Sequence, residues 1–479
     1  MSSIFWFRRD LRLADNPALI AAVRAGDGDV VPVWIVDTTF SSPAGPNRVK
    51  FLRATLESLD VSLNKKLTIR SGDPAIELLA LAKEVGATEV FATGDYAPKG
   101  QARDEQVRAS LASAGVKLHF IDSPYSVIPG TVRTQTGTPC RVFTAFRRGW
   151  ELQPLETPID APTGVSWTKG TSVSLDELVK HSATNRPHYF GDLGLVEAKT
   201  LPPAGEEIAH QLLQNFLPSV DAYNEARNIP SIAGVSRLSP HLRFGTIHPR
   251  QILNTVDGMS TGSVQYRSEI CWREFYADVL FHNPQAVKSN LIPTMDYLRV
   301  DTDDKAVERF QMWAKGQTGY PMVDAAMRQL LEDGWMHNRV RMLVASFLVK
   351  HLHLDWRWGA KWFMWHLIDG DIASNQNGWQ WTAGTGTDAA PFYRVFNPSL
   401  QAERFDPQGL FIHKYVSELR DIPAPQCLQP GGGEGLLAAP GYFPPMVDAA
   451  TERDDALARY AEAKELAKAK AKELAKANK

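Results

Sequence analysis

The sequence predicts a doubly wound parallel α/β domain followed by an all-α domain. Three observations carry this prediction. The first part of the chain alternates short apolar runs with amphipathic stretches, a segment rich in Pro, Thr and Gly follows, and strand signals are then replaced by helical periodicity. We therefore expect an α/β domain over residues 1–130, an interdomain linker over 131–204, a helical domain over 205–445 and a Lys/Ala/Glu-rich terminal helix or tail over 446–479.

Strands and helices are predicted to alternate along the first domain. The expected strands are rich in Val, Ile and Phe and read SIFWF, VVPVWIV, KLTIRSG, TEVFATG and VKLHFID. The stretches between them are amphipathic, and the first of these helices has Asn16 as its cap, Pro17 at its first position and Gly26 at its end. Because no GxGxxG follows the first strand, a dinucleotide site of that kind is not indicated.

The second half reads as a series of helices. Their segments are AHQLLQNFLPSVDAYNEARN, SVQYRSEICWREFYADVLFHNP, DKAVERFQMWAKG, PMVDAAMRQLLEDGW, NRVRMLVASFLVKHLHL and GAKWFMWHLIDG. In the tail, Lys464, Lys468, Lys472 and Lys476 recur every fourth residue, so their charges repel on one helix face. We expect a frayed, solvated terminal helix there; a weak nonspecific grip on DNA is the alternative.

Bulk properties exclude several classes of protein. The net charge of −2 over 479 residues is not the footprint of a nucleic-acid-binding protein, so any DNA contact needs local positive charge. No apolar run reaches the length that spans a bilayer, and the N-terminus is a poor signal peptide. Its three cysteines are far apart and show no metal-binding spacing. We expect a cytoplasmic protein with no membrane contact and no metal.

One predicted helix face is unsuited to a protein core. In YRSEICWREFY, Glu269, Trp272, Arg273 and Tyr276 lie at i, i+3, i+4 and i+7, and so share one face. Such a face can stack a flat ring and hydrogen-bond its edge. An amphipathic helix covering a neighbour explains the pattern equally well.

Two further motifs precede helices. In SRLSPHLRFG, Ser239 is the expected cap, and free N–H groups beside an arginine suit a pyrophosphate, although an ordinary cap is the simpler interpretation. In WMHNRVRM, Asn338, Arg341 and Met342 share a face that offers an amide and a soft contact to a ring; an ordinary first turn with an Arg–Asp pair is the alternative.

The segment DIASNQNGWQWTAGTGTDAAPFYRVFNP has two tryptophans, Trp379 and Trp381, but no Cys, His or Glu. Its GTGT piece is not a phosphate loop, because no Lys-Ser or Lys-Thr pair follows. With no nucleophile or metal set in sight, a bound cofactor is expected to carry the chemistry.

Six ordered blocks resemble the photolyase/cryptochrome flavoproteins, from residue 4 to about residue 420, with the linker weakest. They are FWFRRDLRLADNPAL, SRLSPHLRFG, WREFYADVLFHNP, TGYPMVDAAMRQL, GWMHNRVRM and DGDIASNQNGWQW…TGTDAAPFYRVFNP. Within the family the match looks most like bacterial class I-type cyclobutane pyrimidine dimer photolyases. The resemblance implies an N-terminal antenna-binding α/β domain, a long connector and a helical domain that binds FAD and DNA.

The resemblance also implies which residues bind FAD, in its reduced form FADH⁻. They are Tyr223, Val235, Ser236, Arg237, Leu238, Ser239, Tyr266, Arg273, Arg341, Asp369, Gly370, Asp371 and Asn375, with Arg341 paired to Asp369. Asn375 falls where the family places a residue against flavin N5. Plant cryptochromes carry Asp there, so Asn375 favours repair over signalling.

For the substrate, the resemblance implies that Trp272 and Trp381 sandwich a flipped-out dimer and that Glu269 hydrogen-bonds the pyrimidine edge. The full set implied for substrate or DNA is Arg227, Glu269, Trp272, Arg273, Asn338, Arg339, Met342, Trp381 and Arg404. Six-four photolyases carry a histidine pair where this chain has MHNRVRM, which favours the cyclobutane dimer.

Photoreduction in the family runs along three tryptophans, of which Trp379 and Trp356 match the inner two. The surface member is missing, because DTDDKAVERF has neither Trp nor Tyr. We expect either a rerouted exit through Trp313 or Trp358, or poor photoreduction.

The antenna chromophore implied by Trp34, Asp37, Arg48 and Asp95 is 8-hydroxy-5-deazaflavin. Methenyltetrahydrofolate, or no antenna, is the alternative.

The resemblance thus implies blue-light-driven repair of cyclobutane pyrimidine dimers, by electron transfer from excited reduced FAD to the flipped-out dimer. A monomeric deoxyribodipyrimidine photo-lyase acting on damaged DNA is expected. The alternatives are a cryptochrome-like photoreceptor with little repair activity, and a dark flavoprotein whose tryptophans are only core.

Overall fold

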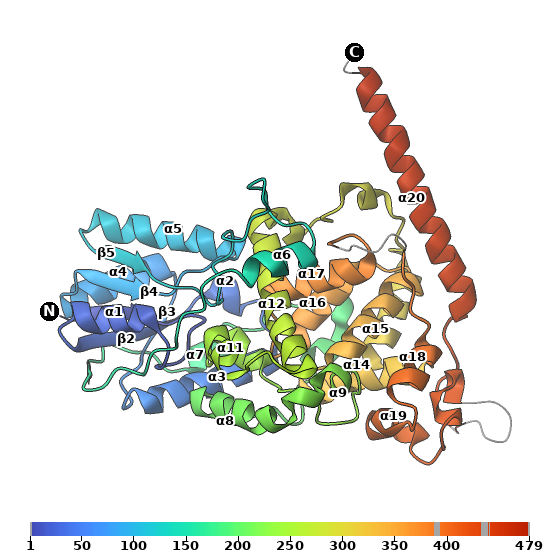
Figure 1. The fold of residues 1–479 in the computed structure, drawn as a ribbon, viewed down its shortest axis with the longest axis horizontal. Coiled ribbons are helices and arrows are strands. Elements are labelled where there is room, and N and C mark those ends of the chain that lie inside the picture. The colour runs from blue at the N-terminus through green and yellow to red at the C-terminus, as the bar shows by residue number, and fades with distance from the viewer. Residues whose placement is uncertain (1, 388–392, 433–438, 440, 478–479) are drawn as a thin grey trace.

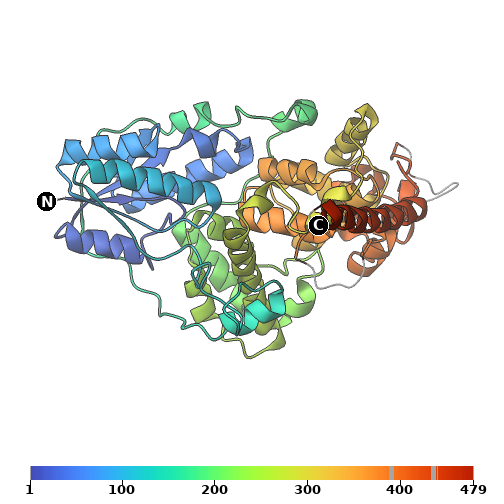
Figure 2. The same ribbon diagram turned by 90° about the horizontal axis from the view of Figure 1, so that it is seen from above.

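A computed structural model describes residues 2–387, 393–432, 439 and 441–477. An α/β half and a helical half lie end to end, and a long C-terminal helix projects from the helical half (Figures 1 and 2). Part of the predicted TGTDAAPFYRVFNP block, residues 388–392, lies outside the described residues. Among the helices described, none has the length and apolarity needed to cross a bilayer.

The predicted parallel sheet is confirmed, with strands in the order β3-β2-β1-β4-β5. The strands are β1 Ser3–Trp6, β2 Asp29–Val36, β3 Thr68–Ser71, β4 Glu89–Ala92 and β5 Lys117–Phe120. Helices connect them: α1 Pro17–Ala25, α2 Thr38–Ser41, α3 Pro46–Ser62, α4 Pro74–Val85 and α5 Pro98–Ser113. Asn16 caps α1 as predicted, since its side chain accepts a hydrogen bond from the Leu19 backbone N–H.

Both faces of the sheet are covered. Alternate side chains of β1 point to opposite faces, so Phe5 packs with α1 and α3, whereas Ile4 packs with α4 and α5. Burial on both faces explains why the strands are continuous apolar runs.

The linker is more structured than its composition predicts. It contains α6 Phe143–Trp150, α7 Asp176–Lys180 and a two-residue strand, β6 Ser166–Trp167, which pairs parallel to β2. A strand this short in a Pro/Thr/Gly-rich segment has no detectable period, which is why the sequence did not predict it.

Within the described residues, twelve α-helices of the helical half precede the C-terminal one. They are α8 Glu206–Phe216, α9 Tyr223–Ala226, α10 Ser239–Phe244, α11 Pro249–Thr255, α12 Thr261–His282, α13 Asp304–Lys315, α14 Pro321–Asp333, α15 Asn338–Lys350, α16 Trp356–His366, α17 Ile372–Ala383, α18 Pro398–Phe405 and α19 Leu410–Tyr415. Short 3₁₀ turns are η1 His188–Leu195, η2 Leu217–Ala222, η3 Pro284–Val287, η4 Pro293–Tyr297, η5 Ser417–Leu419, η6 Gln426–Leu428 and η7 Pro430–Gly432. The first predicted helix is in fact split into α8, η2 and α9, because Pro218 enforces a break.

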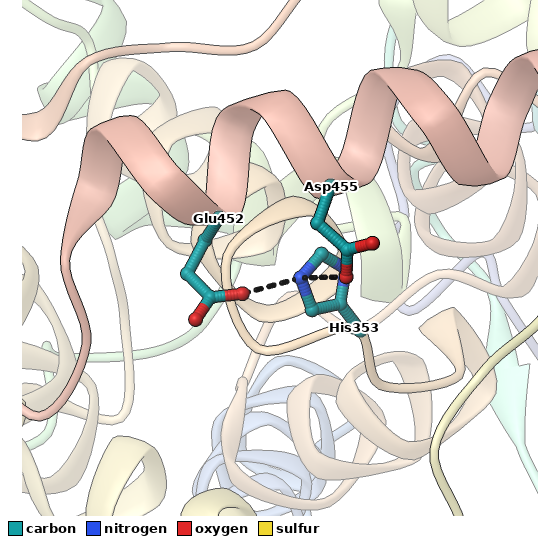
Figure 3. Close-up of side chains that lie close together, drawn as sticks. All are labelled: His353, Glu452 and Asp455. Carbon is teal, nitrogen blue, oxygen red and sulfur yellow. Dashed lines mark hydrogen bonds and ion pairs between the residues drawn. The ribbon is translucent and has the colours of Figure 1, made fainter.

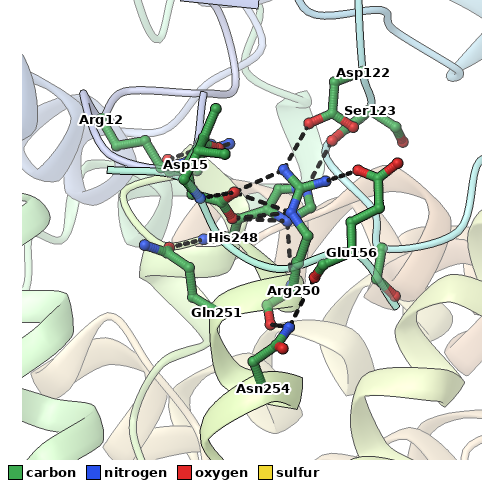
Figure 4. Close-up of polar contacts among 12 residues, drawn as sticks. Arg12, Asp15, Asp122, Ser123, Glu156, His248, Arg250, Gln251 and Asn254 are labelled. Atoms are coloured by element: carbon green, nitrogen blue, oxygen red, sulfur yellow. Dashed lines mark hydrogen bonds and ion pairs between the residues drawn. The ribbon is translucent and has the colours of Figure 1, made fainter. Parts of the chain in front are cut away.

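A buried ionic cluster joins the α/β half, the linker and the helical half (Figure 4). Arg250 of α11 lies 2.9 Å from both Asp15 and Asp122 and 3.2 Å from Glu156. Asp15 is fully buried, so this pairing compensates a carboxylate that water cannot reach.

The terminal helix, α20 Ala449–Ala477, is docked at its start rather than frayed throughout. Nε2 of the buried His353 lies 2.7 Å from Glu452 and 3.3 Å from Asp455 (Figure 3). Arg459 adds a 2.7 Å pair with Asp301. Beyond this anchor most side chains are exposed, as predicted, although Ala463 and Ala467 are buried. Lys468 pairs there with Glu465 at 2.6 Å.

Candidate functional site

The helical half contains a cavity of about 600 Å³, built mainly from α12, α15, α17 and the segment 235–243. The residues predicted to bind FAD all line it: Tyr223, Val235, Ser236, Arg237, Leu238, Ser239, Tyr266, Arg273, Arg341, Asp369, Gly370, Asp371 and Asn375. The predicted substrate residues also line it, apart from Arg404. Residues from distant parts of the chain are therefore gathered in one place.

Asp369 is held at the cavity by two residues. Arg341 donates two hydrogen bonds to its carboxylate, at 2.8 and 3.2 Å, which confirms the expected pair. The Ser239 hydroxyl donates to the same carboxylate at 2.6 Å. The sequence predicted Ser239 as the N-cap of α10. In the structure Ser239 is the first residue of that helix, and Leu238 is at the N-cap.

Asp371 caps α17, since its Oδ1 accepts from the backbone N–H groups of Ala373 and Ser374, both at 3.1 Å. Burial by itself raises the pKa of Asp371, but Arg9, Arg243 and Arg273 outweigh it and hold the pKa well below its ordinary value. The carboxylate is therefore ionised at neutral pH.

The predicted face of α12 forms one wall, because Glu269, Trp272, Arg273 and Tyr276 all line the cavity. The Trp272 ring lies flat on Phe143 of α6, with centroids 3.8 Å apart and planes 6° apart. One face of the indole is thus covered and the other is left for the cavity.

Glu269 is paired before any substrate binds. Its Oε1 lies 2.7 Å from Arg227 and accepts from Gln265 at 2.8 Å. Both Arg227 and Glu269 line the cavity, so this pair stands where a ligand would compete for it.

The N-terminus of α15 supplies Asn338, Arg339 and Met342 to the cavity. His337 caps this helix by accepting from the Arg339 N–H. Burial, and then the nearby arginines, lower the pKa of His337 to about 3. It is therefore uncharged at neutral pH and acts as a helix cap.

Trp379 and Trp381 lie on a helix, so they diverge around its axis while both reach the cavity. Trp379 is buried against Phe363 and Trp313, at centroid distances of 5.0 and 6.3 Å. Asn375, one turn earlier, donates its amide to Ala360 O at 3.0 Å, which leaves the amide oxygen as an acceptor.

Several predicted residues lie outside the cavity lining. Trp356 is buried and donates to Asn290 at 2.9 Å, and Arg404 lies over the Phe405 ring at 5.2 Å. Their roles stay predictions.

The antenna residues belong to the α/β half but are not equivalent. Trp34 is buried in its core, Asp37 caps α2, and Asp95 lies 3.3 Å from Arg103. Arg48 instead points to the helical half: it donates to Gly370 O at 3.3 Å, and burial lowers its pKa to about 9. Its antenna role stays a prediction.

Sequence reasoning missed several side chains around the site. The Trp335 indole N–H donates to the Ser239 hydroxyl at 3.2 Å. The Arg237 guanidinium carbon lies 3.6 Å from the centroid of the Trp335 ring. Arg243 donates to Gly370 O at 2.8 Å, and Arg9 pairs with Asp371. The position of Arg9 just after β1 was a usable signal, because sites in parallel sheets gather at the carboxyl ends of strands.

The cavity fits a flat, anionic cofactor. Its lining combines aromatic walls with an excess of arginines (Arg227, Arg237, Arg243, Arg273, Arg339, Arg341) over acids (Glu269, Asp369, Asp371). Buried N–H groups of Trp379 and Arg339 have no partner within the described part of the chain. A grouping that could hold a metal ion is also found among the described residues: His353, Glu452 and Asp455. It lies at α20, outside the cavity lining.

Comparison with known proteins agrees with this geometry. Residues 3–163 match the family model for DNA photolyase, and residues 266–462 match that for the FAD binding domain of DNA photolyase. A deoxyribodipyrimidine photo-lyase of Halobacterium salinarum is 38% identical, over 96% of this chain and 99% of its own. The crystal structure of a bacterial class III photolyase from Agrobacterium tumefaciens is 37% identical with a TM-score of 0.85, covering 97% of this chain and 98% of that one. A cryptochrome structure from Synechocystis sp. is 27% identical with a TM-score of 0.83, covering 95% and 98%.

Proposed function

The chain belongs to the photolyase/cryptochrome family, and from this premise we propose that it repairs cyclobutane pyrimidine dimers in DNA under blue light. The observation that carries the proposal is the cavity itself. It joins a wall of Trp272 and Trp381 to a floor of paired Asp and Arg residues. The class within the family stays a prediction, because the sequence motifs favour class I whereas the solved relative is named class III.

FAD in its reduced anionic form would supply a light-excited electron when bound. The arginine excess of the lining favours that anion over a neutral ligand. Ser236, Arg237 and Ser239 would hold the diphosphate, and the amide oxygen of Asn375 would accept from the reduced ring. Because the reagent is an electron, these residues need only bind, orient and exclude water.

The lesion would enter between Trp272 and Trp381, which offer flat surfaces to a flipped-out pyrimidine dimer. Glu269 would accept a hydrogen bond from a pyrimidine edge. Arg227 and Gln265 both bond Oε1, so Oε2 would be the acceptor, and Arg227 would turn to a DNA phosphate. Arg339 and Arg404 would add phosphate contacts, which supply the local charge that the net charge of −2 hides.

A photoreceptor with little repair activity is the second candidate, since a cryptochrome shares this fold. Asn375 and the intact Trp272/Trp381 wall favour repair instead. The deciding experiment incubates the purified protein with oligonucleotides that contain thymine dimers, with and without blue light. Light-dependent loss of dimers supports repair; no loss, or equal loss in the dark, refutes it.

For the antenna we propose 8-hydroxy-5-deazaflavin, bound by the α/β half near Trp34, Asp37 and Asp95. The chromophore extracted from the purified protein would be identified by its absorption spectrum. A methenyltetrahydrofolate spectrum would refute this assignment.

A further inference from the structure

Arginines from both halves of the protein hold the short segment between α16 and α17. Arg341 pairs with Asp369, and both Arg243 and Arg48 donate to Gly370 O. Arg9 pairs with Asp371. Arg9 and Arg48 come from the α/β half, on the loop after β1 and on α3. The segment at the cavity floor is therefore positioned across the domain interface.

The contact of Arg9 is direct and well shielded from water. Its Nη2 lies 2.6 Å from Asp371 Oδ2, and the two side chains are 15% and 10% exposed. At these exposures an ion pair is screened little by solvent, and opening it removes one of the three arginines that stabilise the Asp371 carboxylate. The guanidinium also lies 5.9 Å from the centroid of the Tyr125 ring, and its Nε has no partner within the described residues.

Asp371 transmits this contact to α17. While its Oδ2 accepts from Arg9, its Oδ1 caps the first turn of the helix through Ala373 and Ser374. That helix presents Asn375, Trp379 and Trp381 to the cavity. A displaced Asp371 would therefore displace side chains assigned to the flavin, to electron supply and to the lesion.

We propose that Arg9 is a positioning residue for the flavin site. It fixes Asp371 and hence the start of α17, and it places a positive charge beside the flavin cavity. This inference deepens the proposed function and rests on FAD binding in the cavity. It assigns the α/β half a second task besides holding an antenna.

The test compares three variants of the full-length protein. Arg9→Met removes the charge but keeps much of the apolar length, and Arg9→Lys keeps the charge without the planar fork. Arg8→Met is the matched control: Arg8 is also buried, but its partner is Asp104, 2.5 Å away within the α/β half. For each protein, the midpoint potential of bound FAD and the FAD affinity of the apoprotein are measured in the dark without DNA.

We expect Arg9→Met to bind FAD about tenfold more weakly. If only the affinity for the reduced anion falls about tenfold, the midpoint potential of bound FAD becomes about 30 mV more negative. Arg9→Lys should recover most of the potential, and Arg8→Met should match the wild type even if it unfolds at lower denaturant. A potential and affinity of Arg9→Met equal to those of the wild type would overturn the inference, as would equal shifts in Arg8→Met.

These readouts separate this inference from the repair proposal. If the wild type fails to repair dimers but Arg9→Met shifts the potential, the positioning role stands and the repair activity does not. If the wild type repairs dimers but Arg9→Met leaves the midpoint potential unchanged, the repair activity stands and the positioning role does not. Should Arg9→Met fail to fold, Arg9→Lys alone decides. A weaker FAD affinity or a residual shift of the midpoint potential in Arg9→Lys supports the inference, and wild-type values of both overturn it.

Discussion

Replacement of Trp272 by alanine tests how the cavity would recognise a lesion. Phe143 covers one face of the Trp272 ring at 3.8 Å, so the indole can stack one further ring, not two. One base–aromatic stack is worth about 1–3 kcal/mol by alanine substitution. The variant should therefore bind dimer-containing DNA about 5- to 150-fold more weakly.

The assay is fluorescence anisotropy with two oligonucleotides of one sequence, with and without a single dimer, at fixed salt. Affinity for undamaged DNA depends on phosphate contacts and should be unchanged in Trp272→Ala. Trp167→Ala, which alters the linker strand β6 beside β2, is the control for general loss of an indole. FAD content is measured in parallel to show that the cavity is intact.

Two results would refute the reasoning. Equal affinity of wild type and Trp272→Ala for the dimer would mean that the exposed indole face does not meet the lesion. An equal loss for damaged and undamaged DNA would mean that Trp272 acts only through packing, by supporting α6 against α12.

Three further predictions concern stability and electron supply. Arg250→Met should lower the free energy of unfolding by about 3–5 kcal/mol, because it strands the buried Asp15 carboxylate; denaturant unfolding measures this, and a loss below about 1 kcal/mol would contradict it. Burial lowers the pKa of His241 to about 4, below its value of about 6.5 in an unfolded chain. Because the unfolded state binds the proton first, stability falls as pH drops from about 6.5 toward 4. The buried His241 therefore lowers the free energy of unfolding by about 2 kcal/mol at pH 5. Unfolding curves of His241→Gln should lack that part of the pH dependence. Trp379→Phe and Trp356→Phe should each slow the reduction of bound FAD under blue light; undiminished photoreduction in both would exclude the assigned electron path.

Elements and faces could be predicted because their signals are local. Alternating apolar runs predicted the parallel sheet, and a helical spacing of Glu269, Trp272, Arg273 and Tyr276 predicted a shared face that does line the cavity. Family motifs added the Arg341–Asp369 pair, which the structure confirms.

Local signals also misled where tertiary contacts compete. Ser239 looked like a helix cap, but Asp369 takes its hydroxyl. The antenna role of Arg48, which the family resemblance implied, stays a prediction, and its guanidinium donates to Gly370 O in the other half. A side chain with several donors bonds the acceptor that folding brings close. Residues next to it in the sequence do not indicate which acceptor that is.

By itself the sequence determined the α/β and helical halves, the family and many, though not all, of the residues at the cavity. Only the tertiary structure decided how those residues are held: Phe143 behind Trp272, Arg227 on Glu269 and Arg9 on Asp371. The physical reason is separation along the chain. Periodicity and capping act within a few residues, whereas the pair of Arg9 and Asp371 joins positions 362 residues apart, and exists only once the two halves have packed together.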